Sequence, residues 1–132
     1  MAPASIATVT LKTHRPREVA AFWRELLGYQ VAPNHSASVL LVGEGGPALL
    51  IQPSAEATEP GAIHLDIRPE DQQACVSLAL ELGGRTADVG QAGDEGWVVM
   101  ADPGGNVFCI LQSHAAHLRS VIDDPGTPTE IE

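Results

Sequence analysis

Two stretches of the chain carry apolar residues at intervals of three and four positions, the spacing of an amphipathic helix. The first covers residues 16–27, opens with Pro16 and stops at Gly28. The second opens with the Arg-Pro pair at 68–69 and closes at Gly83. Proline at the first helical position and glycine after the last are typical helix boundaries. We therefore predict two helices that occupy equivalent places in two halves of the chain.

Alternating apolar and polar positions predict short strands around each helix. In each half, one strand precedes the helix and three follow it, so both halves have the order β-α-β-β-β. The predicted strands cover residues 6–13, 29–32, 38–42 and 48–52 in the first half, and 62–68, 85–89, 97–101 and 107–112 in the second.

This internal repeat predicts one α+β domain over residues 1–112. Module one covers residues 5–53 and module two covers residues 62–112. We expect the two βαβββ modules to form a curved mixed sheet around a cavity, with the helices on the outer face. Residues 113–132, which contain prolines and acidic residues, are expected to be a mobile C-terminal tail.

The strand alternation also predicts which residues line the cavity. In the stretch 62–68, Ile63 and Leu65 lie on the apolar side that packs under the helices, so His64 and Asp66 point the opposite way. Trp97 is suited to stack on a flat ligand, and core packing is an equal alternative. The predicted ligand-binding residues are Thr8, Thr10, Leu50, Gln52, His64, Asp66, Trp97 and Cys109.

The composition of the chain limits the classes of binding partner to expect. The formal net charge is −10, which disfavours nucleic acid and favours solubility or a cationic ligand. No apolar run approaches the roughly 18 residues of a membrane span, and the N-terminal stretch lacks a secretory pattern. We expect a cytoplasmic protein with reduced thiols at Cys75 and Cys109.

Three stretches, FWRELLGY, IHLDI and GWVVMADPGGNVFCIL, resemble the vicinal-oxygen-chelate superfamily. Its members include glyoxalase I, extradiol dioxygenases, fosfomycin-resistance enzymes and bleomycin-resistance binding proteins. The chain looks most similar to the small single-domain, glyoxalase-like members. The resemblance implies a homodimer, and it implies that a metal ion in the enzymes of the family would be held at Thr8, Leu50, His64 and Cys109.

Only His64 among these four positions is a usual ligand of that metal. Cys109 stands where the catalytic members usually have a glutamate, and the side chain of Leu50 has no electron pair to donate. We therefore expect no metal cofactor, with His64 as the remaining candidate ligand. The simplest interpretation of Cys109 is that it acts as a small apolar side chain that packs in the wall of the cavity.

These observations leave several functions open. The first is metal-independent binding of a small organic molecule, cationic or planar, in the cavity. The second is a metal-independent lyase, isomerase or hydrolase in which His64 and Asp66 are the catalytic acid and base. The third is a divalent-metal enzyme similar to glyoxalase or dioxygenase, with Asp66 or Gln52 as an additional ligand. An interaction module with an acidic tail is the last alternative.

Overall fold

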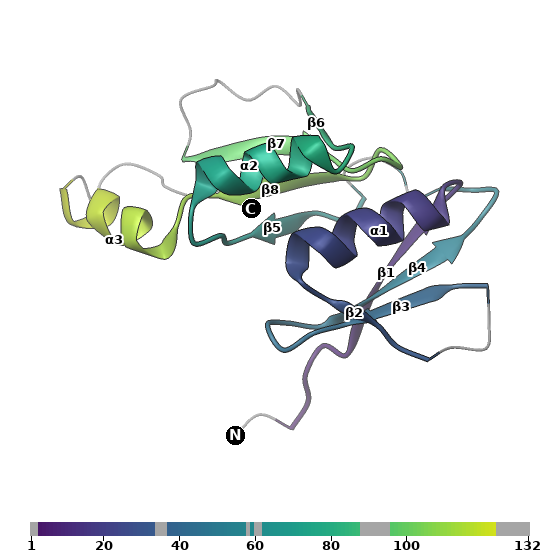
Figure 1. Cartoon of the computed structure of the whole chain (residues 1–132). Coiled ribbons are helices and arrows are strands. Elements are labelled where there is room, and N and C mark those ends of the chain that lie inside the picture. Colours follow the sequence, from purple (N-terminus) through teal and green to yellow (C-terminus); the bar gives the residue numbers. More distant parts are fainter. Residues whose placement is uncertain (1–2, 34–36, 58, 60–61, 88–95, 124–132) are drawn as a thin grey trace.

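A computed structural model describes residues 3–33, 37–57, 59, 62–87 and 96–123 (Figure 1). It has the predicted α+β class and two βαβββ modules. Module one contains β1 (Thr8–Thr13), α1 (Pro16–Leu27), β2 (Gln30–Val31), β3 (Val39–Val42) and β4 (Ala48–Pro53). Module two contains β5 (Leu65–Ile67), α2 (Gln72–Glu81), β6 (Arg85–Thr86), β7 (Trp97–Ala101) and β8 (Val107–Leu111), and α3 (His114–Asp123) follows it.

Each module forms its own four-stranded mixed sheet. The strand orders are β1-β4-β3-β2 and β5-β8-β7-β6, so the same topology occurs twice. In both sheets the first strand pairs in parallel with the last, because the helix carries the chain back between them. The predicted curved sheet is thus built from two separate sheets, whose edge strands include β1 and β5.

Helix α1 has the predicted bounds. Pro16 occupies its first turn, and Gly28 ends it in the left-handed conformation with φ of 67°. Glycine adopts this conformation without the clash that a Cβ atom would introduce. The buried face of α1 is Val19, Ala20, Phe22 and Trp23.

Helix α2 begins three residues later than predicted, at Gln72 instead of Pro69. Asp71 is its N-cap, and the Asp71 carboxylate accepts a hydrogen bond of 3.0 Å from the backbone N–H of Ala74. This bond satisfies a backbone donor that a helix leaves unpaired at its start, which favours a beginning after Asp71. Pro69 therefore lies in the connection before the helix.

Helix α3 differs from the sequence-based expectation, because residues 114–123 are helical instead of forming a mobile arm. The hydroxyl of Ser113 accepts a hydrogen bond of 3.1 Å from the backbone N–H of Ala116. This side-chain bond is of the kind that begins a helix. The rest of the tail, residues 124–132, lies outside the described residues, as do residues 88–89 of the predicted strand 85–89.

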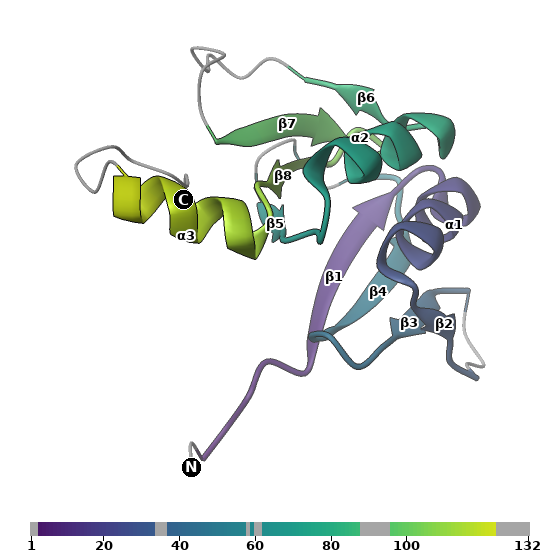
Figure 2. The same cartoon turned by 60° about the vertical axis from the view of Figure 1, so that its left-hand side comes forward.

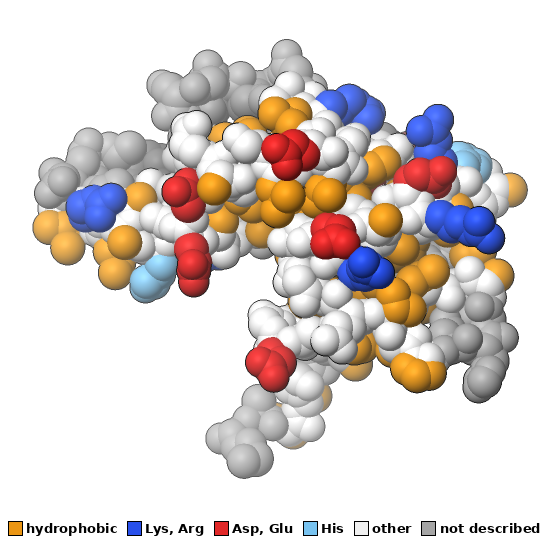
Figure 3. Space-filling view, viewed as in Figure 1, with side chains coloured by type: hydrophobic (Ala, Val, Ile, Leu, Met, Phe, Trp, Pro, Cys, Tyr) orange, Lys and Arg blue, Asp and Glu red, His pale blue; other side chains and the backbone are white. Residues whose placement is uncertain are grey.

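One apolar core joins the two modules. Helices α1 and α2 lie side by side on the same side of their sheets (Figures 1 and 2), and apolar side chains follow the junction between them on the surface (Figure 3). Trp23 of α1 contacts Phe108 of β8 edge to face, with ring centroids 4.8 Å apart. The Trp23 Nε1–H also donates a 2.8 Å hydrogen bond to the buried carboxylate of Asp102 in module two.

Over the described ranges, the helices are too short and too polar to span a bilayer.

Candidate functional site

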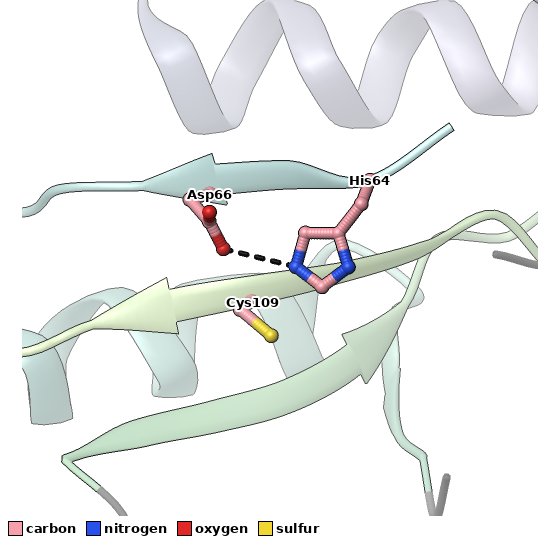
Figure 4. A group of neighbouring side chains, drawn as sticks. All are labelled: His64, Asp66 and Cys109. Carbon is pink, nitrogen blue, oxygen red and sulfur yellow. Dashed lines mark hydrogen bonds and ion pairs between the residues drawn. The ribbon is translucent and has the colours of Figure 1, made fainter. Parts of the chain in front are cut away.

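His64, Asp66 and Cys109 form a cluster on the face of the second sheet that points away from α2 (Figure 4). His64 and Asp66 are two positions apart in an extended stretch and therefore project to the same side. Cys109 of β8 lies opposite Asp66 of β5 in the parallel register. His64 Nε2 is 2.9 Å from an oxygen of Asp66, and the donor atoms of all three residues lie within 4.8 Å of one another.

The three side chains differ in burial. The side chains of His64 and Asp66 are 32% and 33% exposed, whereas Cys109 is 1% exposed. Burial, and then the negative charge of Asp66, raise the pKa of the Cys109 thiol to about 11. A thiol with this pKa is almost entirely protonated at neutral pH, so Cys109 is a poor nucleophile in the metal-free protein.

Cys109 also belongs to an apolar cluster on this face. Trp97 packs against the cluster, and its Nε1–H is buried without a hydrogen-bond acceptor among the described residues. The ring of Trp97 is therefore packed, as the core-packing interpretation expects. Its polar atom is unpaired among the described residues, which is compatible with the interpretation that Trp97 contacts a ligand. The other members are Ala87, Val99, Val107 and Leu111.

The other predicted residues lie on the first sheet. Thr10 is opposite Leu50 in the β1–β4 register, just as Asp66 is opposite Cys109 in the second sheet. The position that carries a donor in module two is therefore occupied by an apolar side chain in module one. Thr8 and Gln52 share this sheet, and Gln52 is opposite Lys12.

The metal positions implied by the family resemblance do not form a ligand set in this chain. The equivalent of Cys109 in the first sheet is Leu50, which has no donor atom. Among the described residues, the one group of three metal-capable side chains that lie close together is instead within module two, where Asp66 joins His64 and Cys109.

A cavity of about 900 Å³ lies between the two modules. Asp66 is the one predicted ligand-binding residue that lines it, so the cavity is not centred on the face where the sequence placed it. Arg68 and Glu44 are its other charged residues. Its apolar walls are formed by Val9, Leu27, Tyr29, Val42 and Leu49 of module one and by Leu65 and Ile67 of β5.

Sequence reasoning missed these walls because their alternation assigned Val9, Leu49, Leu65 and Ile67 to the core. That assignment holds in part, since all four contact the common core. Val9, Leu65 and Ile67 also reach the cavity because β1 and β5 are edge strands, each with one side that no neighbouring strand of the same sheet covers, whereas Leu49 lies on β4 beside β1. The edge position depends on strand order, which alternation does not contain.

Tyr29 is a firmly held part of the cavity wall. Its hydroxyl donates a hydrogen bond of 3.0 Å to the carbonyl oxygen of Pro47. Its ring lies against Gly43, where an added Cβ atom would be 2.4 Å from Tyr29 Cδ1. The glycine therefore allows the aromatic ring to lie close to the turn that lines the cavity.

Comparison with known proteins supports the fold. A family model described as a glyoxalase-like domain matches residues 8–111. No protein of curated function matches the sequence significantly.

Solved structures with the same fold are numerous. A glyoxalase/bleomycin resistance protein/dioxygenase family enzyme from Burkholderia phytofirmans PsJN matches with a TM-score of 0.66 and 18% identity, over 83% of this chain and 98% of that one. TnmS3, an antibiotic binding protein from Streptomyces sp. CB03234, matches with a TM-score of 0.63 and 19% identity, over 86% and 98% of the two chains. A glyoxalase-related enzyme from Fulvimarina pelagi matches with a TM-score of 0.61 and 20% identity, over 82% and 87%. At these identities the similarity shows the shared fold.

Proposed function

The chain belongs to the glyoxalase-like domain family, and from that premise we propose that it binds a small organic molecule, without a metal ion, in the cavity between its two modules. The observation that carries the proposal is the cavity itself, whose walls are largely apolar and which has charged groups from Asp66, Arg68 and Glu44.

The size and lining of the cavity suit this function. Its volume of about 900 Å³ lies within the range of small-molecule sites, roughly 300–1,000 Å³. Such sites combine apolar walls with a few placed polar groups that orient the ligand. Here the ring of Tyr29 offers an apolar surface, and Asp66 offers an acceptor that is also hydrogen-bonded to His64.

Metal independence rests on the composition of the lining. Of the three clustered metal-capable residues, only Asp66 lines the cavity. The structural similarity to TnmS3 adds support, because that protein has the same fold and is described as an antibiotic binding protein.

The test is a thermal-shift screen of small natural products in the presence of a chelator, followed by calorimetry of the hits. Val42→Arg places a long charged side chain on an exposed residue of the cavity wall and is expected to abolish binding. Val31→Arg is the matched control, since Val31 is exposed on the neighbouring strand and does not line this cavity. Hits that bind Val42→Arg as tightly as the wild type, or that bind only when metal is added, would contradict the proposal.

The 2.9 Å contact between His64 and Asp66 favours a second function, acid–base catalysis on the bound molecule. A carboxylate at one ring nitrogen fixes the orientation of an imidazole, as a proton-transfer site requires. Each hit from the screen would be incubated with the protein and followed by mass spectrometry. Turnover that disappears in His64→Gln while binding persists would establish catalysis, and binding without turnover would leave the binding function alone.

A further inference from the structure

We propose that the molecule bound in the cavity is a short peptide, which adds as an extended strand to the free edge of β5. This inference rests on the proposed binding function and names the chemical class of its ligand. Within the described residues, β5 pairs only with β8, so the backbone N–H and C=O groups on its other side have no strand partner. Unpaired backbone groups along a sheet edge are a template for a further strand.

The cavity runs along this free edge. Four consecutive residues, 65–68, line it. Successive side chains of a strand point to opposite faces of the sheet, so a cavity on one face alone would be lined by every second residue. Leu65 and Ile67 pack against the core on the helix-covered face, whereas Asp66 lies on the open face. Because both sets line the cavity, the edge of the strand itself borders it.

The lengths of the edge strands distinguish this cavity from the outer sides of the molecule. The outer edges of the two sheets are β2 and β6, and each is two residues long. Very short edge strands are one way in which proteins prevent unwanted strand pairing. The inner edges are longer, with six residues in β1 and three in β5, and both strands contribute to the lining of the cavity. The longer free edges therefore border the cavity between the modules.

The side chains beside the edge predict the sequence pattern of the peptide. An added strand directs alternate side chains to the two faces of the sheet. On the helix-covered face these side chains would contact Leu65 and Ile67, which are half-buried and apolar. On the open face they would contact Asp66 and Arg68, whose charges are opposite. The edge is therefore complementary to a peptide that alternates apolar residues with one basic and one acidic residue.

The dimensions of the site favour a free peptide over a strand of a folded partner protein. The cavity volume of about 900 Å³ is that of a small-molecule site. The strand β5 is three residues long, whereas strands that pair in folded proteins are usually roughly five or six residues long. A short peptide can pair with this edge and still fit between the turn of residues 43–47 and the second module.

The experiment uses the full chain and a defined peptide mixture as the probe. The mixture contains acetylated pentapeptide amides with Val, Leu or Phe at the first, third and fifth positions and Lys, Glu or Thr at the second and fourth. Peptides retained by the protein in rapid size-exclusion chromatography are identified by mass spectrometry. We expect the retained peptides to carry one Lys and one Glu. Val42→Arg should retain none, and Val31→Arg, outside the cavity, should retain them like the wild type.

Backbone methylation of a retained peptide tests the strand pairing itself. In an extended peptide, alternate N–H groups point to the same side, so methylating the second and fourth amides, or the first, third and fifth, blocks one side at a time. Both methylated forms keep every side chain. One form should bind roughly tenfold more weakly or worse, because it loses its backbone hydrogen bonds to the edge. The other form should bind like the parent peptide.

Arg68→Glu tests the side-chain pattern. Arg68 is exposed, so the variant should keep the fold, which circular dichroism checks. Because the open face beside the edge then carries two carboxylates, the variant should retain peptides with two Lys instead of one Lys and one Glu. An unchanged set of retained peptides would show that the peptide does not lie along this edge.

Two further results would overturn the inference and leave the proposed function standing. One is that no peptide is retained although other small molecules bind and are lost in Val42→Arg. The other is that the parent peptide and both methylated forms bind equally. Peptide binding that appears only after deletion of residues 1–7 would also overturn it, because the added strand would then be the exposed stretch 3–7 of a second copy. If neither peptides nor other small molecules bind, the proposed function fails as well.

Discussion

Asp102 is the buried carboxylate that fixes the turn after β7. It accepts hydrogen bonds from Trp23 Nε1, from the backbone N–H groups of Gly104 and Asn106, and from the Asn106 side chain. Asp102→Ala leaves these buried donors without an acceptor, so the free energy of unfolding should fall by about 3 kcal/mol. Urea denaturation measures the change. The exposed Glu70 provides a control, because Glu70→Ala should shift the value by less than about 0.5 kcal/mol.

The raised pKa of the Cys109 thiol predicts that the folded protein loses stability at alkaline pH. Its pKa is raised from the ordinary 9.0 to about 11 by burial and by the charge of Asp66, so the folded chain favours the protonated form. The resulting stabilisation is complete below pH 9 and is lost as the pH rises towards 11. In metal-free protein, the free energy of unfolding should therefore fall more steeply over this interval in the wild type than in Cys109→Ala. Parallel pH profiles of the two proteins, measured by urea denaturation, would refute this prediction.

At the scale of the element, α2 depends on the residue that precedes it, its N-cap Asp71. The Asp71 carboxylate is the side-chain cap of this helix, whereas α1 has no side-chain cap and begins with proline. Asp71→Ala should lower the free energy of unfolding by about 1 kcal/mol, and Asp71→Asn by less, because asparagine is also a good cap. Thermal unfolding of the two variants measures the difference. An equal loss in both would show that the carboxylate acts through its charge instead of as a cap.

Helix α2 also shows which features can be predicted from the sequence and which cannot. Apolar spacing predicts α1 and α2, because a helix must bury one face. The start of α2 at Pro69 is predicted wrongly, because the hydrogen bond of the Asp71 side chain favours a start after Asp71. Alternation within one strand correctly predicts that His64 and Asp66 project to the same side of the sheet. Their proximity to Cys109 depends on the register of β5 and β8, which are far apart in the chain. Strand pairing over such a distance is set by the packed sheet and not by the local pattern.

At the scale of the whole molecule, the cavity was the least predictable feature. It is lined by both modules, so it depends on how α1 packs against the second sheet. The repeat in the sequence predicts two similar modules but contains no information on their relative orientation. The homodimer stays a prediction of the family resemblance for the same reason, because it depends on surfaces that pattern and spacing do not describe.

The shared core leads to a prediction about the modules as folding units. Phe108 of module two contacts Phe22 and Trp23 of module one, and Asp102 is bonded to Trp23. A chain of residues 62–123 would expose Phe108 to water and leave the Asp102 carboxylate without its indole donor, so the hydrophobic contribution of this contact would be lost. Small domains have little stability to spare, and we therefore expect this fragment to be unfolded by circular dichroism and by amide dispersion in NMR spectra. Adding a fragment of residues 1–57 should restore the folded spectrum, because it returns α1 to the second sheet. A folded fragment 62–123 on its own would show that each module carries a sufficient core and that the Trp23–Phe108 contact is a docking interface between two independent units.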